Sequence, residues 1–298
     1  MGSRLVRSLV EAGHTVRALT LPHDPFISRL TGVDCKIVYG DISDANSLKD
    51  VFKDIEVVYH LAAIIIAHDP RLFEKINING TRNMVDGALS AGVKHFIYIS
   101  SASVVYPKPT PYSLSKRECE RIVTEQSAMH YTIIRPTLVY EKNGGQEFMM
   151  FMDYLMKYPI VPFIGRGRAM KNPVDVNDLI KGLLTIPGNK ICFGKTYNFS
   201  GGEEISIWDF AHLILEHQGK RKLFIPIPEW ICKLIALAMK TVMKRPPLTW
   251  NIIAGIIQDA NLDNSSATLD IGYNPIGIRD GMEKYYPRTD SPEQRGSQ

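Results

Sequence analysis

The chain has 298 residues, of which 45% are hydrophobic and 22% charged, as expected of a globular protein with one large domain or two small ones. The formal net charge is +4, and no stretch is dense enough in lysine and arginine to predict a nucleic-acid-binding groove. The four cysteines lie far apart and the histidines lack metal-ligand spacing, so we expect reduced thiols, no metal site and a cytoplasmic protein.

Apolar residues in the first half alternate between strand and helix periodicity. Helices are predicted over residues 3–13, 47–54, 79–92 and 112–126, and strands over residues 14–20, 35–41, 56–63, 95–101 and 131–140. Short apolar strands joined by helices predict a parallel, doubly wound α/β sheet, which binds ligands at the carboxyl ends of its strands. Beyond about residue 138 the alternation weakens, which predicts a second, smaller α+β domain.

The stretch PYSLSK places Tyr112 and Lys116 one turn apart on a predicted helix, so both side chains lie on one face. A tyrosine hydroxyl has an ordinary pKa of about 10, and a nearby ammonium stabilises its phenolate. Lowering that pKa to about 7 takes roughly 4 kcal/mol, which a partly buried pair beside a cationic nicotinamide ring can supply. The pair is a candidate for acid/base catalysis, although ordinary surface helices also carry this spacing.

Hydroxyl side chains follow the predicted strand 95–101 at its carboxyl end, at Ser100, Ser101 and Ser103. Ser101 can hydrogen-bond a substrate oxygen while Tyr112 transfers the proton. Serines in this place can also merely cap the following loop. Together with the tyrosine–lysine pair, however, they predict an active site.

Several segments resemble, in order, the landmarks of one family: YGDISD, VVYHLAA, NINGTRN, IIRPTLVY and NPVDVNDLIKGL. With them, nearly the whole chain resembles an extended short-chain dehydrogenase/reductase of the NAD-dependent epimerase/dehydratase group. The resemblance implies a Rossmann-type dinucleotide-binding domain in residues 1–136 plus about 173–200. It implies a substrate domain in residues 137–172 and 201–298.

The resemblance also implies roles for individual residues. Tyr112 is the acid/base, Lys116 lowers its pKa and binds the nicotinamide ribose, and Ser101 orients the reacting oxygen. The implied cofactor is NAD, with NADP as an alternative, and it carries the hydride. The positions implied to bind it are Gly2, Thr20, Asp41, Ile42, Leu61, Ala62, Ala63, Asn77, Ser100, Tyr112, Lys116 and Pro136. Thr81 is implied to support the site, and Asp178 is expected to be a helix N-cap.

The start of the chain departs from this pattern. The family opens with a strand and a glycine-rich turn that meets a pyrophosphate, whereas here Met1 already precedes the helix and Gly2 stands at the last glycine. Either Met1 is an internal methionine and an upstream frame encodes the missing strand, or the short chain exists and binds cofactor poorly. Thr20 replaces the acidic residue that would hold the adenosine ribose, and Leu21 is not the arginine that a 2′-phosphate requires. NAD is therefore preferred, with NADP left open.

The segment IPEWICKLIALAMKTVMKRPP predicts a basic, apolar helix too short to cross a bilayer. Lys233, Lys240 and Lys244 fall near one face and Trp230 stands at the start. Residues 228–245 are therefore a candidate for peripheral membrane contact. The alternative is a helix that covers the substrate pocket.

Three functions follow from these features. The preferred one is an NAD(P)-dependent epimerase/dehydratase or oxidoreductase acting on a nucleotide-sugar hydroxyl, with Arg166, Arg168 and Arg221 available for the diphosphate. The second is 3β-hydroxysteroid dehydrogenase-like oxidation of an apolar alcohol, favoured by the short stretch between Ser101 and Tyr112. The third is a non-catalytic binding or assembly subunit on the same fold. We expect a small-molecule substrate, no nucleic acid, and a homodimer as a candidate assembly.

Overall fold

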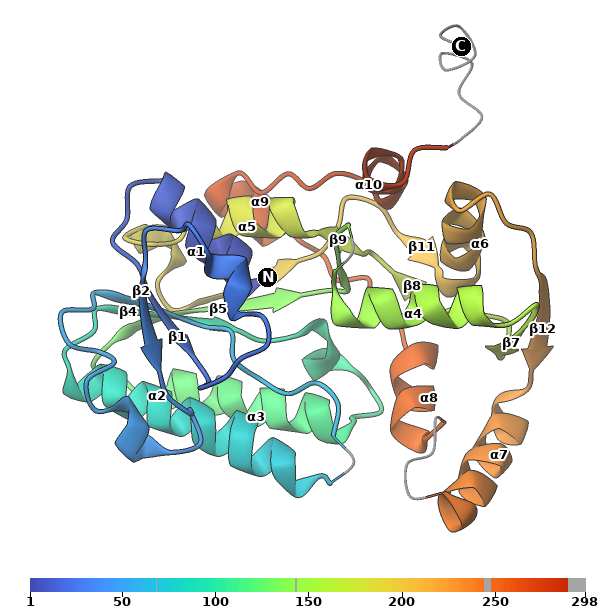
Figure 1. The fold of residues 1–298 in the computed structure, drawn as a ribbon, viewed down its shortest axis with the longest axis horizontal. Coiled ribbons are helices and arrows are strands. Elements are labelled where there is room, and N and C mark those ends of the chain that lie inside the picture. Colours follow the sequence, from blue (N-terminus) through green and yellow to red (C-terminus); the bar gives the residue numbers. More distant parts are fainter. Residues whose placement is uncertain (68, 143, 244–247, 289–298) are drawn as a thin grey trace, which may run out of the picture. The chain divides into compact units, whose positions relative to one another are not determined.

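The computed structural model describes residues 1–67, 69–142, 144–243 and 248–288 (Figure 1). The chain packs as two compact units. Unit 1 comprises residues 1–136, 177–199 and 263–273, and unit 2 comprises residues 137–176, 200–262 and 274–298. Residues 263–273, which the sequence placed in the substrate domain, pack in unit 1, where the Tyr273 ring stacks on Phe199 with centroids 4.4 Å apart.

Unit 1 is built around parallel strands. The strands β3 (Val57–His60), β4 (His95–Ile99), β5 (His130–Pro136) and β10 (Lys195–Phe199) form one sheet in the order β10-β5-β4-β3. A separate parallel pair joins β1 (Arg17–Thr20) to β2 (Lys36–Tyr39). The predicted parallel α/β class is confirmed. Among the described residues no strand pairing joins these two sheets.

The helices that lie wholly in unit 1 are α1 (Gly2–Glu11), α2 (Asn79–Ser90), α3 (Pro111–Glu125) and α9 (Ser265–Ile271). Figure 1 shows α2 and α3 side by side along the sheet. All five residues of β4 are buried, as in a central strand covered on both faces. This burial explains why the segment HFIYI does not alternate between apolar and exposed polar residues. Phe96 and Tyr98 of this strand join Cys119 and Val123 of α3 in the core.

Two local predictions differ from the structure. Residues 47–54 form no α-helix: a 3₁₀ helix covers Ala45–Leu48, and turns follow it, with Asp54 at φ +61°. The helix-like apolar spacing there reflects burial of Leu48 and Phe52 in the core, and a segment this short does not form a helix on propensity alone. The N-cap prediction for Asp178 was wrong, because α5 (Val176–Leu184) begins two residues earlier. Its carboxylate stabilises the first turn instead.

Unit 2 mixes helices with short strands. Its helices are α4 (Gln146–Lys157), α6 (Ile207–His217), α7 (Glu229–Val242), α8 (Trp250–Ile257) and α10 (Ile278–Tyr285). The strands are β6 (Val139–Tyr140), β7 (Ile160–Ile164), β8 (Met170–Lys171), β9 (Val174–Asp175), β11 (Ile205–Ser206) and β12 (Leu223–Ile227). They pair as β12-β7 and β6-β9, both parallel, and β11-β8, antiparallel. Aromatic residues dominate the core, including Phe148, Phe163 and Phe210.

The four cysteines are free thiols, and all but Cys35 are buried. No helix among the described residues has both the length and the apolar character needed to cross a bilayer.

Candidate active site

The strand β4 ends at the two serines predicted from the sequence. The Ser100 N–H donates to the Ile134 carbonyl at 2.7 Å, which extends the ladder to β5 beyond the end of β4. Ser101 then leaves the sheet as the N-cap of a 3₁₀ helix (Ala102–Val105), and its Oγ accepts a hydrogen bond from the Ser103 N–H at 3.2 Å. The half-buried Ser101 hydroxyl therefore lies at the carboxyl edge of the sheet.

The helix α3 carries Tyr112 in its first turn and Lys116 one turn later. Pro111 occupies the first helical position, and a reciprocal cap precedes it. In this cap the Ser113 N–H donates to Thr110 Oγ1 at 3.1 Å, while the Thr110 N–H donates to Ser113 Oγ at 2.8 Å. The start of the helix, and with it the half-buried Tyr112, is thus fixed by local sequence.

Lys116 is 2% exposed and is held beneath the strand end. Its Nζ donates to the Ile99 carbonyl at 2.6 Å and lies 4.3 Å from the centroid of the Tyr98 ring. Because Ile99 precedes Ser101 by two residues, this bond anchors α3 to the strand end that carries Ser101. Burial lowers the pKa of Lys116 to about 8, although neighbouring acidic groups on α3 raise it in part.

The Asn77 side chain connects the loop at Ile64 to helix α3 by hydrogen bonds. Its Nδ2 donates to the Ile64 carbonyl and to Ser115 Oγ, both at 3.0 Å, and its Oδ1 accepts from the Ile64 N–H at 2.9 Å. Ser115 Oγ in turn donates to the Tyr112 carbonyl at 2.7 Å. The sequence placed Asn77 among the cofactor-binding residues. Its amide is occupied by these bonds, so it holds the first turn of α3 in place. It lies in a π-helical turn (Phe73–Ile78), a feature frequent at functional sites.

A carboxylate at the end of β1 was missed by the sequence reasoning. Thr20 Oγ1 donates to Asp24 Oδ2 at 3.2 Å, and the Phe26 N–H donates to Asp24 Oδ1 at 2.7 Å. His23, at φ +61°, turns the chain so that Asp24 returns to the strand end. An acidic group in this place suits the adenosine ribose 2′-hydroxyl and repels a 2′-phosphate. In the sequence, Asp24 is marked only by its place in the turn LPHD, which follows the strand.

The segment after β2 holds the next two predicted positions. Asp41 Oδ1 accepts a hydrogen bond from the Ser43 N–H at 2.8 Å, so this carboxylate shapes its own turn. Ile42 is buried in the core, and its carbonyl accepts from Asn83 Nδ2 at 2.8 Å. Gly80 makes room for Ile42, because a Cβ at residue 80 would lie 2.7 Å from Ile42 Cδ1.

The remaining predicted positions also lie in unit 1. Gly2 is the exposed first residue of α1, Leu61, Ala62 and Ala63 follow β3, and the buried Pro136 ends β5. Thr81 Oγ1 lies 3.0 Å from Nε2 of the buried His60. Every residue predicted for catalysis or cofactor binding thus belongs to one unit.

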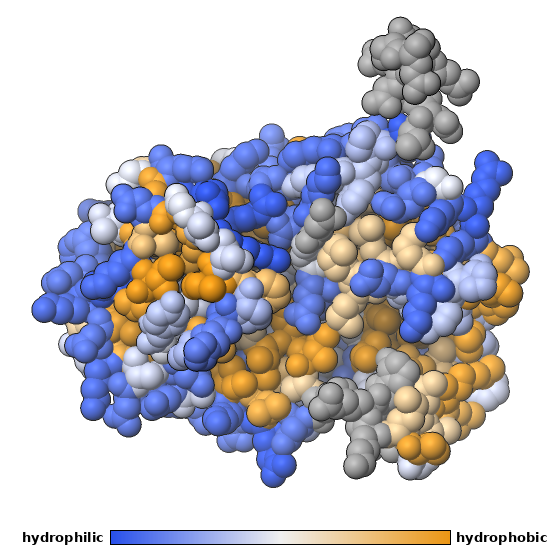
Figure 2. Space-filling view, in the orientation of Figure 1, coloured by the Kyte–Doolittle hydropathy of each residue, from blue (hydrophilic) through white to orange (hydrophobic). Residues whose placement is uncertain are grey.

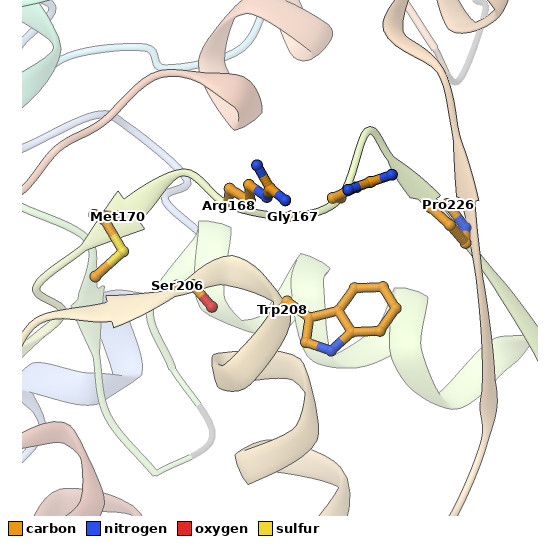
Figure 3. Close-up of a pocket in the computed structure, with 7 residues that line it drawn as sticks. Gly167, Arg168, Met170, Ser206, Trp208 and Pro226 are labelled. Carbon is orange, nitrogen blue, oxygen red and sulfur yellow. The ribbon is translucent and has the colours of Figure 1, made fainter.

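Unit 2 has a pocket of its own, of about 510 Å³ (Figure 3). It is lined by Arg166, Arg168, Trp208 and the smaller or apolar residues Gly167, Met170, Ser206 and Pro226. Aromatic rings hold Trp208, with the Phe163 and Phe224 centroids 5.3 and 5.1 Å from its own. Within the described part of the chain neither guanidinium forms an ion pair. Arg221, the third arginine considered from the sequence, is exposed and does not line this pocket.

Residues 1–198 match the model of the NAD dependent epimerase/dehydratase family. The chain belongs to this family. Its predicted dependence on NAD is therefore confirmed at the level of the family, as is its character as an enzyme of the oxidoreductase and isomerase type. Nothing in this match assigns a substrate.

Proteins similar to this chain are named either for sterols and steroids or for a nucleotide sugar. The chain is 33% identical to "Sterol demethylase protein B" of Methylococcus capsulatus, over 94% of this chain and 92% of that protein. It is 24% identical to a "3 beta-hydroxysteroid dehydrogenase/Delta 5-->4-isomerase" of Mycobacterium tuberculosis, over 93% of this chain and 84% of that protein. It is 25% identical to a "UDP-glucose 4-epimerase" of Vibrio cholerae, over 78% and 77%. Both substrate predictions agree with this range of names.

Solved structures share the fold. A UDP-glucuronic acid 4-epimerase from Bacillus cereus, crystallised with UDP-glucuronic acid and NAD, superposes with a TM-score of 0.74 at 22% identity. The match covers 96% of this chain and 94% of that one. At this identity the likeness supports the Rossmann-type architecture and nothing finer.

Proposed function

We propose that the protein catalyses NAD-dependent hydride transfer at a secondary hydroxyl group, with Tyr112 as the acid/base. The observation that carries the proposal is the buried Lys116 ammonium, fixed by the Ile99 carbonyl one helical turn from Tyr112. A buried cation is unfavourable unless it stabilises a charge that forms nearby. The phenolate of Tyr112 is such a charge.

The protein's own residues handle the proton. Tyr112 takes the hydroxyl proton of the substrate as the carbon–hydrogen bond breaks, and Ser101 Oγ donates a hydrogen bond to the same substrate oxygen. At a separation of about 4–5 Å, which this role requires of the phenolate and the ammonium, two unit charges attract by roughly 3–4 kcal/mol at an effective dielectric of about 20. That is close to the roughly 4 kcal/mol needed to bring a tyrosine pKa from about 10 to about 7.

The residues present suit the cofactor of the family, and NAD, when bound, supplies the hydride acceptor. Ser100 Oγ is buried and has no hydrogen-bond partner among the described residues, as expected of a group that bonds a ligand. The Lys116 ammonium has three donors, of which one bonds the Ile99 carbonyl, leaving two for ribose hydroxyls. Asp24 and Thr20 are the candidates for the adenosine ribose.

For the substrate we favour an apolar secondary alcohol of sterol-like character. The relative that shares 33% identity over nearly the whole chain is named for a sterol, which supports this class. A relative named as a 3β-hydroxysteroid dehydrogenase, 24% identical over 93% of this chain, supports it as well. This order reverses the preference that we drew from the sequence.

A nucleotide sugar is the second candidate, and the pocket in unit 2 favours it. Two guanidiniums without ion pairs among the described residues suit a diphosphate, and the Trp208 indole offers a face for a base or sugar. The same chemistry in unit 1 would then serve epimerisation or dehydration.

Thermal-shift titration separates the two classes. We expect hydroxysteroids to raise the melting temperature in the presence of NAD, and UDP- and dTDP-sugars to leave it unchanged. Stabilisation by a nucleotide sugar that weakens with salt, and none by steroids, would reverse the order. Absence of NAD binding would favour the non-catalytic subunit. We also propose that the protein forms the homodimer predicted from the sequence.

A further inference from the structure

Exposed apolar side chains concentrate in one short stretch of unit 2. The described residues include 21 exposed large hydrophobic side chains, and nine of them fall between residues 223 and 252. They are Leu223, Ile225, Trp230, Leu234, Leu237, Val242, Met243, Trp250 and Ile252. Figure 2 shows the resulting orange and tan surface over α7. Monomeric proteins rarely expose apolar groups in such a cluster without a partner for them.

The helix α7 has apolar residues on two opposite faces. Cys232 and Ala236 are buried and pack with Ile253 of α8. Trp230, Leu234 and Leu237, spaced by four and three residues, form a stripe on the other face and are 63%, 57% and 55% exposed. A helix that is apolar on both faces needs cover on both. The inner face is covered by α8, and the outer face lacks cover within the described residues.

The charge of the stretch of sequence that contains this stripe indicates what covers it. Residues 220–250 contain seven lysines and arginines and one acidic residue, Glu229, so this stretch carries a formal +6 against +4 for the whole chain. Lys233 pairs with Glu229 and lies 5.1 Å from the centroid of the Trp250 ring. Tryptophan and aliphatic side chains flanked by cations suit the interface of an anionic bilayer.

We propose that Trp230, Leu234 and Leu237 form a docking surface for anionic phospholipid bilayers. The 14 residues of α7 extend about 21 Å, too short to cross the hydrocarbon core, so the helix lies along the interface. The surface differs from the predicted one, since it rests on exposed apolar side chains rather than on the lysines of the helix. Of the lysines predicted to take part, Lys244 lies outside the described residues, as does the side chain of Lys240.

Docking of this kind goes beyond the proposed function and does not depend on it. It adds a route for an apolar substrate that partitions into the bilayer, because the enzyme would meet the substrate at the membrane surface. The chemistry at Tyr112 would be unchanged by the loss of docking.

Vesicle flotation of the full chain tests the proposal. We expect the wild-type protein to float with vesicles of phosphatidylcholine and phosphatidylserine, and at least tenfold less with phosphatidylcholine alone or in high salt. The double variant Leu234→Glu and Leu237→Glu should lose binding at least tenfold. Its melting temperature should stay unchanged because both side chains are exposed. The matched control is Leu269→Glu on α9, where an 85% exposed leucine lies in unit 1.

Three results would overturn the proposal: no flotation of the wild type, equal flotation of the double variant, or equal loss in the Leu269 control. A further result would assign the surface to a second copy of the chain. In that case sedimentation would show a wild-type dimer that the double variant dissociates, without lipid binding. Turnover of a detergent-solubilised substrate should be the same in wild type and double variant, which separates failure of docking from failure of the proposed function.

Discussion

Replacing Lys116 by methionine should stabilise the cofactor-free protein while it removes activity. Burial lowers the pKa of Lys116 from its ordinary 10.5 to about 8. That difference corresponds to about 3 kcal/mol of unfavourable free energy for the charged form in the folded state. Methionine has a similar length and no charge, so this cost disappears. The hydrogen bond to the Ile99 carbonyl is also lost, at about 1–2 kcal/mol. The net gain at pH 7 should be about 1–2 kcal/mol.

The pH dependence of the free energy of unfolding tests the direction of this effect. The folded-state pKa of Lys116 is lowered, so between about pH 8 and pH 10.5 the unfolded chain binds more protons, and the stability of the wild type rises with pH. The advantage of the Lys116→Met variant should therefore be complete below about pH 8 and vanish as the pH approaches 10.5. Urea unfolding at a series of pH values measures both curves.

A matched control is Lys94→Met, because Lys94 is exposed and pairs with the exposed Glu56. Its effect should stay within about 0.5 kcal/mol at every pH. If Lys116→Met proved less stable than the wild type at pH 7, the claim that this ammonium is held at a cost to stability would be wrong.

Four further outcomes are expected. Tyr112→Phe should lower turnover by ~10²–10⁴-fold in a steady-state assay and leave NAD affinity unchanged, since only the hydroxyl is removed. Retention of more than about a tenth of the activity would exclude Tyr112 as the acid/base. Glu120→Gln should move the alkaline limit of the pH–rate profile downward, because Glu120 raises the pKa of Lys116. It should also weaken the pair with Arg135, whose Nη2 lies 2.6 Å from Glu120 Oε2, which a lower urea midpoint would report. Gly80→Ala should lower the free energy of unfolding in urea by about 1–3 kcal/mol, because the added methyl group overpacks against Ile42. An unchanged free energy of unfolding would mean that the Ile42 side chain moves aside without strain. NADP should bind more weakly than NAD by isothermal titration, and equal affinity would contradict a role for the carboxylate at the end of β1.

The elements that the sequence predicted well are those whose pattern has one physical cause. The helix that carries Tyr112 and Lys116 has a proline and a reciprocal cap at its start, and its first residue follows from local chemistry. β4 was recognisable because a strand covered on both faces is mainly apolar, as in the run Phe96–Ile99.

Other features depend on contacts between distant residues, and the sequence could not supply them. Asp24 reaches the end of β1 only through the positive φ of His23, which no periodicity reveals. The amide of Asn77 is occupied by Ile64 and Ser115, which lie 13 and 38 residues away along the chain. Apolar spacing at residues 47–54 matched a helix, but burial of Leu48 and Phe52 accounts for it without one.

The central claim is hydride transfer from an apolar alcohol to NAD with Tyr112 as the acid/base. The most direct test is NADH formation, followed by absorbance, when the protein is mixed with NAD and a 3β-hydroxysteroid. We predict NADH formation by the wild type and a loss of at least about a hundredfold in Tyr112→Phe. Equal rates in the two proteins, or NADH formation with nucleotide sugars and none with any hydroxysteroid, would contradict the account.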